Sequence, residues 1–83
     1  MEKYEQHGLT RLEDDILGSF GMSETIEREE LNQQMLSYQQ LAAAKSLVAK
    51  GLLTRLQDDD SIVYKLTPRG VRLFHIREEE ETY

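Results

Sequence analysis

Residues 36 to 77 read without interruption as a helix, a two-stranded hairpin and a second helix, and this order constrains the fold more than any other feature. The pattern predicts the first of these helices over residues 39–50, because Gly51 follows it and can adopt the left-handed conformation that a helix C-terminus needs. A strand ending at Gln57 is expected next. A helix followed at once by a strand is therefore expected in the middle of the chain.

The second strand and the last helix carry their own local signals. Three aspartates and a serine supply a polar turn over 58–61, and residues 62–66 then alternate as the strand of a half-buried sheet does. Thr67 can cap the following helix with its hydroxyl group. Pro68 in the first helical position loses no hydrogen bond, because that amide has no partner inside the helix.

The segment 47–70 contains Leu-x-x-x-Gly-Leu-Leu, then Arg55, a short polar turn between two strands, and Leu66-Thr67-Pro68-Arg69-Gly70. In these features it resembles the small winged helix-turn-helix regulators of bacteria and archaea. The best match is to the broad group that includes the multiple-antibiotic-resistance and phenolic-acid-decarboxylase regulators. The resemblance extends from Leu31 to Phe74. It implies an α+β, mostly helical fold of the winged helix-turn-helix type, with a three-helix core, a two-stranded wing and a C-terminal helix. It also implies a DNA-binding transcriptional regulator of a prokaryotic cell.

The chain divides into three parts without a long linker. A polar N-terminal arm is predicted over 1–8, the winged-helix domain over 9–77 and an acidic C-terminal tail over 78–83. Eighty-three residues lie near the lower limit at which a hydrophobic core stabilises a domain unaided, so association with another chain is a reasonable expectation.

The composition excludes several other classes of protein. The chain has no cysteine, so neither disulfides nor a thiolate metal site can supplement the core. No apolar run approaches the roughly twenty residues that a membrane span requires. The polar residues 1–7 lack the apolar region of a signal peptide. A soluble, cytoplasmic protein is expected.

Thr10 and Glu13 have the spacing of a capping box, which predicts a first helix from Arg11 to Gly18. The apolar residues expected on its inner face are Leu9, Leu12, Ile16, Leu17 and Phe20.

A second helix is expected over 28–36, because its acidic start suits the positive end of the helix dipole. Leu31 and Met35 would face inward, and Ile26 is a plausible residue of a short third strand. The turn at 36–38 is short, so the second helix and the helix over 39–50 would be crossed neighbours in a helix-turn-helix.

The third helix has two different faces when its residues are placed at one hundred degrees each. Leu41, Ala44, Leu47 and Val48 form the predicted core face, and Gln39, Ala42, Ser46 and Ala49 form the outward one, with Ala43 and Lys50 at one flank and Lys45 at the other. The resemblance implies that this helix enters the major groove of double-stranded DNA. The residues expected at the bases and phosphates are Tyr38, Gln39, Ala42, Lys45, Ser46, Lys50, Arg55 and Lys65.

Two features favour a different use of the same fold. The net charge is −6, whereas affinity for nucleic acid rests on neutralising phosphates, although most of the lysines and arginines lie in the second half of the chain. The wing tip carries three consecutive aspartates where a DNA-binding wing often carries basic residues. The alternative is a protein-protein interaction module that does not bind DNA, with the alanine-rich third helix or the acidic wing as its docking site.

The last helix carries more apolar surface than a small monomer needs. Val71 and Phe74 can face the core, while Leu73 and Ile76 project to another side, where they predict a homodimer interface. The alternative is that Leu73 and Ile76 pack on the first helix within one chain.

No pattern indicates catalysis. His7 and His75 have no neighbouring motif with metal-ligand spacing, and the chain contains no nucleophile motif or glycine-rich phosphate loop. Three adjacent aspartates in a turn rarely point at one metal ion. The sequence therefore predicts no enzyme, no cofactor and no metal site.

Overall fold

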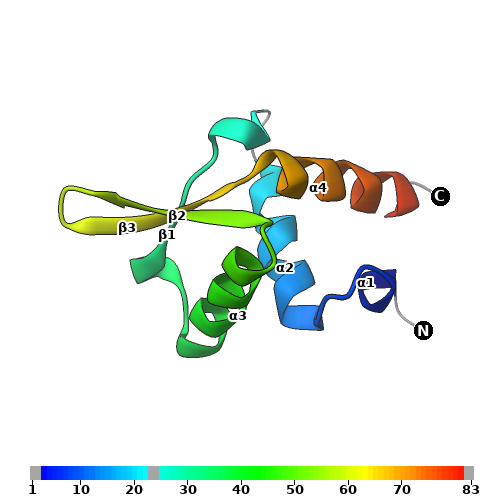
Figure 1. The fold of residues 1–83 in the computed structure, drawn as a ribbon, viewed down its shortest axis with the longest axis horizontal. Coiled ribbons are helices and arrows are strands. Elements are labelled where there is room, and N and C mark those ends of the chain that lie inside the picture. Colours follow the sequence, from blue (N-terminus) through cyan, green and yellow to red (C-terminus); the bar gives the residue numbers. More distant parts are fainter. Residues whose placement is uncertain (1–2, 23–24, 82–83) are drawn as a thin grey trace.

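The computed structural model describes residues 3–22 and 25–81 (Figure 1). A hairpin reaches out on one side, and the longer helices lie at the centre and on the other side. The described α-helices are α1 (Lys3–Gln6), α2 (Arg11–Ser19), α3 (Tyr38–Ala49) and α4 (Pro68–Glu81), the strands are β1 (Leu31–Asn32), β2 (Leu53–Asp58) and β3 (Ser61–Leu66), and single turns of 3-10 helix occur at η1 (Phe20–Met22), η2 (Ile26–Arg28) and η3 (Gln33–Met35). The protein is α+β and mostly helical, as predicted.

The described strands form one antiparallel sheet in the order β1, β3, β2. Asp58 pairs with Ser61, so the hairpin turn consists of Asp59 and Asp60 alone. Asp59 has a φ of 53°, in the left-handed region that a short polar side chain tolerates better than most others. The predicted pairing of 53–66 as a hairpin is confirmed.

Side-chain caps explain where three of the helices begin. The Glu13 amide donates to the Thr10 hydroxyl at 3.2 Å and the Thr10 amide donates to the Glu13 carboxylate at 2.8 Å, so the predicted capping box of α2 is confirmed. Ser37 and Gln40 form a second box at the start of α3, which was not predicted. The α3 helix consequently begins one residue earlier than expected. At α4 the Thr67 hydroxyl accepts from a backbone amide of the first turn at 3.0 Å, as predicted.

The core lies between the sheet, α2, α3 and α4. Its buried hydrophobic residues are Leu9, Ile16, Leu17, Phe20, Ile26, Ala43, Ala44, Leu47, Leu52, Leu53, Tyr64, Leu66 and Phe74. The prediction for Leu12 was wrong, because this side chain is 41% exposed. On α3 the buried face is turned toward Ala43, which was expected at the flank, whereas Leu41 and Val48 are only half-buried.

The predicted second helix over 28–36 does not form. The chain is extended after η2, Leu31 pairs with Tyr64 in the sheet, and only a single 3-10 turn separates β1 from the start of α3. The Asn32 side chain caps that turn by accepting from the Gln34 amide at 2.9 Å. The third strand exists, but it lies at Leu31–Asn32 and not at Ile26. Pairing with a distant strand outweighs a weak local helical preference.

Both ends of the chain are more ordered than predicted. Residues 3–6 of the expected polar arm form α1, where Tyr4 is half-buried and His7 contacts Glu80 of α4 at 2.9 Å. The first four residues of the expected acidic tail, 78–81, are the last turn of α4. Residues 1–2, 23–24 and 82–83 lie outside the described part of the chain.

We expect Gly70→Ala to prevent α4 from seating on the hairpin. A Cβ atom at this position would lie 2.0 Å from the backbone carbonyl oxygen of Leu52, and a backbone atom in a packed turn cannot yield as a side chain can. The free energy of unfolding should fall by about 3 kcal/mol, as measured by urea denaturation. The exposed His75 of the same helix provides the control, because His75→Ala should change it by less than about 0.5 kcal/mol. Equal stabilities of the two variants would contradict this account.

Candidate nucleic-acid interface

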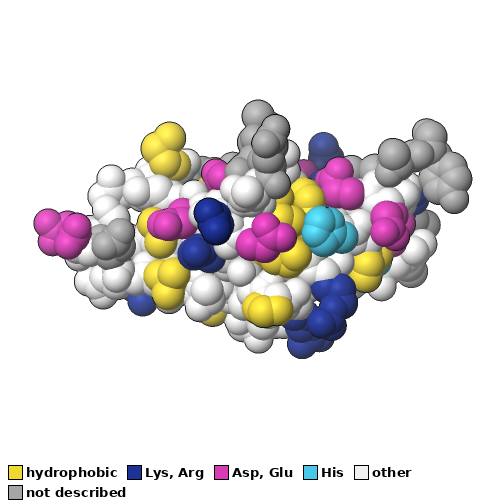
Figure 2. Space-filling view, turned by 90° about the horizontal axis from the view of Figure 1, so that it is seen from above, with side chains coloured by type: hydrophobic (Ala, Val, Ile, Leu, Met, Phe, Trp, Pro, Cys, Tyr) yellow, Lys and Arg dark blue, Asp and Glu magenta, His cyan; other side chains and the backbone are white. Residues whose placement is uncertain are grey.

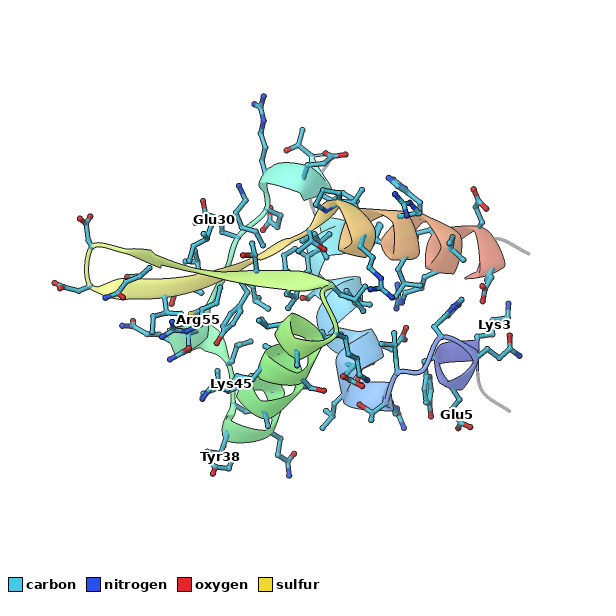
Figure 3. The ribbon with its side chains drawn as sticks, viewed as in Figure 1. Lys3, Glu5, Glu30, Tyr38, Lys45 and Arg55 are labelled. Carbon is cyan, nitrogen blue, oxygen red and sulfur yellow. The ribbon has the colours of Figure 1, made fainter. Side chains whose placement is uncertain are left out.

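One side of α3 is open to solvent. The Tyr38 side chain is 89% exposed, and Gln39, Ala42 and Lys45 are also exposed. The capping box of Ser37 fixes the first turn, so these side chains project from a well-defined helix start. Figure 3 shows Tyr38 and Lys45 on the side of α3 that faces away from α4. Tyr38, Ala42 and Lys45 therefore share one side of α3, and Gln39 is exposed beside them in the first turn.

Arg55 and Lys65, the two hairpin residues predicted to contact phosphates, lie on opposite faces of the sheet. Arg55 pairs with Tyr64, and Lys65 pairs with Thr54. Residues directly opposite each other in a sheet share a face, and neighbours along a strand alternate. Arg55 thus lies on the face of the buried Tyr64, toward α3, and Figure 3 shows it on that side of the hairpin. Lys65 points to the other face and cannot join the same surface.

Ser46 and Lys50 are bound within the chain by Glu13. The Ser46 hydroxyl donates to one Glu13 carboxylate oxygen at 2.7 Å, and the Lys50 ammonium donates to the other at 2.7 Å. Lys50 also donates to the carbonyl oxygen of Gly8 at 2.8 Å. The Glu13 side chain is only 1% exposed, so these contacts tie the back of α3 to α2. Both polar groups therefore have partners within the chain, and their role as DNA contacts stays a prediction.

The Glu13 carboxyl is held in its charged form. Burial acts to raise its pKa, but hydrogen bonds from Lys50, the Thr10 amide and Ser46, together with the charge of Lys50, outweigh burial, and the pKa lies below the ordinary value of 4.5. A buried carboxylate with three donors, one of them a lysine, is satisfied, so it needs no further ligand. Glu13 is therefore a structural residue that sets the orientation of α3.

Lys45 and Arg55 remain available to a partner. Both are exposed, and neither forms an ion pair with any residue in 3–22 or 25–81. Tyr38, Leu41, Ala42 and Lys45 line a shallow hollow of about 120 Å³. The candidate surface defined by the structure consists of Tyr38, Gln39, Ala42, Lys45 and Arg55. We call this set the α3 surface.

Met35 is an exposed apolar residue whose position was not predicted. Its side chain is 80% exposed in η3, next to the start of α3. It was expected to point inward on a helix over 28–36, and that helix does not form. It therefore exposes a flexible apolar side chain two residues before Ser37, the cap of α3.

Charge is unevenly spread over the molecule. Figure 2, seen from the α4 side, shows one group of lysine and arginine side chains gathered at an edge, with acidic side chains along the middle and at both ends. Asp59 and Asp60 are exposed at the tip of the hairpin. The hairpin therefore carries positive charge near its middle, at Arg55, and negative charge at its tip.

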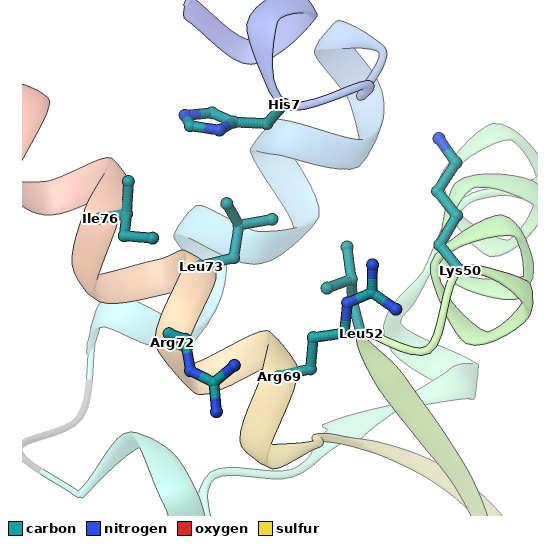
Figure 4. Close-up of a pocket in the computed structure, with 7 residues that line it drawn as sticks. All are labelled: His7, Lys50, Leu52, Arg69, Arg72, Leu73 and Ile76. Atoms are coloured by element: carbon teal, nitrogen blue, oxygen red, sulfur yellow. The ribbon is translucent and has the colours of Figure 1, made fainter.

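A second hollow lies on the other side of the molecule, beside α4. It has a volume of about 500 Å³ and is lined by His7, Lys50, Leu52, Arg69, Arg72, Leu73 and Ile76 (Figure 4). Leu73 is half-buried and Ile76 is 41% exposed, and these are the two residues predicted at a dimer interface. Acidic side chains are absent from this lining, which combines an apolar floor with basic groups.

The described residues contain neither a cluster of metal ligands nor a helix that could span a membrane. Within 3–22 and 25–81, no three His, Asp or Glu side chains lie close enough together to hold a metal ion. None of the helices in that part of the chain combines the length and apolar character needed to cross a membrane. Comparison with family models, curated proteins and solved structures gave no match.

We expect Glu13→Gln to destabilise the protein and to remove part of its sensitivity to acid. An amide cannot hold Lys50 and Ser46 as the carboxylate does, so the free energy of unfolding should fall by about 2 kcal/mol at neutral pH. Because the pKa of Glu13 is lower in the folded state, its contribution is fully present above the unfolded value of about 4.5. That contribution is lost as the pH falls through the folded-state pKa. Urea unfolding from about pH 7 to about pH 3 measures both effects.

Glu5 on α1 provides the control for this experiment, because its side chain is exposed and Glu5→Gln makes the same chemical change. That variant should follow the unmodified protein at every pH. If Glu13→Gln also lost stability in parallel with the unmodified protein on acidification, Glu13 would not be the carboxyl that responds.

Proposed function

We propose that this protein is a DNA-binding transcriptional regulator of the winged helix-turn-helix type, working in the cytoplasm of a prokaryotic cell. In this proposal η3 and α3 form the helix-turn-helix, and the hairpin β2–β3 is the wing. The observation that carries the proposal is the division of α3 into two faces. One side is fastened to α2 through Glu13, and another presents Tyr38, Ala42 and Lys45 to solvent, with Gln39 exposed between the two sides in the first turn.

Each residue of the α3 surface has a chemical role in this proposal. The Gln39 amide can pair with adenine in the major groove, and the Ala42 methyl group can meet the methyl group of thymine. The Tyr38 hydroxyl can donate to a phosphate oxygen. Lys45 and Arg55 neutralise phosphates on either side, which supplies the part of the affinity that depends on salt.

The acidic tip of the hairpin limits how the DNA can lie. Asp59 and Asp60 would be repelled by phosphates, so the duplex must approach the base and middle of the hairpin, near Arg55, and not its tip. The net charge of −6 weakens attraction at long range. Binding should therefore be weak for a single chain, and a homodimer with two α3 surfaces on a palindromic site would strengthen it.

A second function has its own supporting observation. Met35 in η3 and Tyr38 at the start of α3 are 80% and 89% exposed, and Ala42 is exposed as well, so large and small apolar groups face solvent in this part of the chain. Exposed apolar groups of this kind mark protein interfaces as well as base contacts. A winged-helix module that binds a protein partner through the same surface is the alternative.

We expect Lys45→Glu to weaken binding to duplex DNA. Fluorescence anisotropy with random and genomic duplexes at several salt concentrations should show affinity that falls with salt. The substitution should lower the affinity by about tenfold and reduce the slope of log affinity against log salt by about one, because one phosphate contact is lost. Absence of binding by the unmodified protein even at low salt would remove this proposal and leave the alternative.

Two further variants separate local contacts from net charge. Arg28→Glu makes the same change of charge on η2, at an exposed position outside the α3 surface, and should alter affinity much less. Lys50→Gln should lower thermal stability because it removes the partner of Glu13, while the salt slope stays the same. Equal effects of Lys45→Glu and Arg28→Glu on binding would mean that only total charge matters.

A further inference from the structure

The hollow beside α4 has apolar walls that come from two distant parts of the chain. We call it the α4 hollow. Its volume of about 500 Å³ lies within the range of about 300 to 1,000 Å³ that is typical of small-molecule sites. Figure 4 shows Leu73 and Ile76 on α4, with Leu52 and Lys50 across from them. Leu52 is buried in the core, so the position of the wall opposite α4 is fixed by the packing of the fold.

Two guanidinium groups at the α4 hollow are available to a ligand. Arg69 and Arg72 are exposed, and neither forms an ion pair with any residue in 3–22 or 25–81. They are three residues apart on α4, so their side chains are neighbours on the helix surface. A Cβ atom at Gly51 would lie 3.8 Å from Nη1 of Arg69, so this guanidinium group lies beside the turn that follows α3. Arg69 therefore reaches across from α4 toward the opposite wall.

Lys50 offers a hydrogen-bond donor to the α4 hollow but no net charge. Its ammonium group has three N–H bonds, of which one is donated to Glu13 and one to the carbonyl oxygen of Gly8. Its charge is balanced by the Glu13 carboxylate at 2.7 Å, and its side chain is 38% exposed, so a ligand can reach the third N–H bond. His7 closes one edge of the hollow and is held there by Glu80 at 2.9 Å. The unbalanced charge at the hollow is therefore that of the two arginines.

We propose that the α4 hollow binds a small phosphate monoester that carries a hydrocarbon group, such as an aryl or alkyl phosphate. At neutral pH a phosphate monoester has a charge of about −1.5 to −2, which matches two guanidinium groups. Arg69 and Arg72 donate paired N–H bonds to the phosphate oxygens, a geometry for which guanidinium is well suited. The hydrocarbon group lies against Leu73, Ile76 and Leu52, where it removes apolar surface from water.

Other anions fit the α4 hollow less well. A carboxylate has a single charge and leaves one guanidinium group unbalanced. Inorganic phosphate has the charge, but it leaves the apolar walls in contact with water. The phosphodiesters of a nucleic acid have one charge for each phosphate and no hydrocarbon group beside it. A phosphate monoester with an apolar part satisfies both the charge and the walls.

This site is independent of DNA binding, because no residue that lines the α4 hollow belongs to the α3 surface. It does share Leu73 and Ile76 with the predicted homodimer contact. A bound ligand and a second chain would therefore compete for these two side chains. The arginines are open to solvent, so the affinity should be moderate and should fall as salt is added.

Three probes test which parts of the ligand are recognised. Naphthyl phosphate is titrated into isotope-labelled protein at low salt and about pH 7.5, where most of the phosphate monoester is doubly charged, and amide NMR shifts are followed. The shifts should centre on Gly51, Leu52, Leu73 and Ile76 and saturate at ligand concentrations on the order of 1 mM. Naphthoate has the same rings with one charge, and inorganic phosphate has no rings. Each should bind at least about tenfold more weakly. DNA is absent from all samples, so a failure here is distinct from a failure to bind DNA.

Matched variants test the role of the two arginines. Arg69→Gln and Arg72→Gln should each lower the affinity for naphthyl phosphate by about tenfold, because one charged contact is lost. Both positions are exposed, and circular dichroism melting checks that the variants are folded. Arg28→Gln makes the same change on η2, away from the α4 hollow, and should alter the affinity by less than about twofold. Shifts that never saturate or that centre elsewhere would overturn the proposal. So would equal affinities for naphthyl phosphate and naphthoate, or equal losses in Arg28→Gln and Arg72→Gln.

Discussion

The arrangement of α2 and α3 depends on the hydrogen bonds of the buried Glu13 carboxylate. It accepts hydrogen bonds from the Thr10 amide, from Ser46 and from Lys50, so one side chain caps α2 and binds the back of α3 at two points along the helix. A carboxylate that is 1% exposed would be costly without these donors. Because Ser46 and Lys50 are held, the rotation of α3 about its own axis is fixed, and the side with Tyr38 faces solvent.

Some basic residues of this acidic chain are paired with carboxylates on α2, and others are not. Lys50 and Arg77 neutralise carboxylates on α2, at Glu13 and Asp14, with distances of 2.7 and 2.6 Å. They contribute to the stability of the fold, and their charge has little effect outside the chain. Lys45 and Arg55 have no such partner among the described residues, so their charge can act on another molecule. The net charge of −6 is therefore less informative about function than the location of exposed basic side chains such as Lys45 and Arg55.

The parts of the fold that sequence predicts are those specified by neighbouring residues. The hairpin turn at 58–61, the cap at Thr67 and the capping box of α2 each depend on residues within a few positions of one another, and all three are confirmed. The segment 28–36 was assigned to a helix from its acidic start, and its strand was missed because Leu31 pairs with Tyr64, which lies far along the chain. The role of Ser46 was missed for the same reason, since its acceptor on Glu13 is 33 residues away.

The proposed DNA contact and the dimer contact predicted at Leu73 and Ile76 can be made at the same time, because they use different sides of the molecule. Figure 1 shows α3 and α4 on opposite sides of α2, with the hairpin to one side of both. A pair of chains joined through α4 would thus leave each α3 surface uncovered, whereas joining through α3 would hide Tyr38 and Lys45. The body of the chain between the two surfaces is held by Glu13, Phe74 and the hairpin, so the separation of two α3 surfaces would be set by packing and not by a flexible linker. Fixed separation is what a twofold-symmetric partner with two equivalent sites requires.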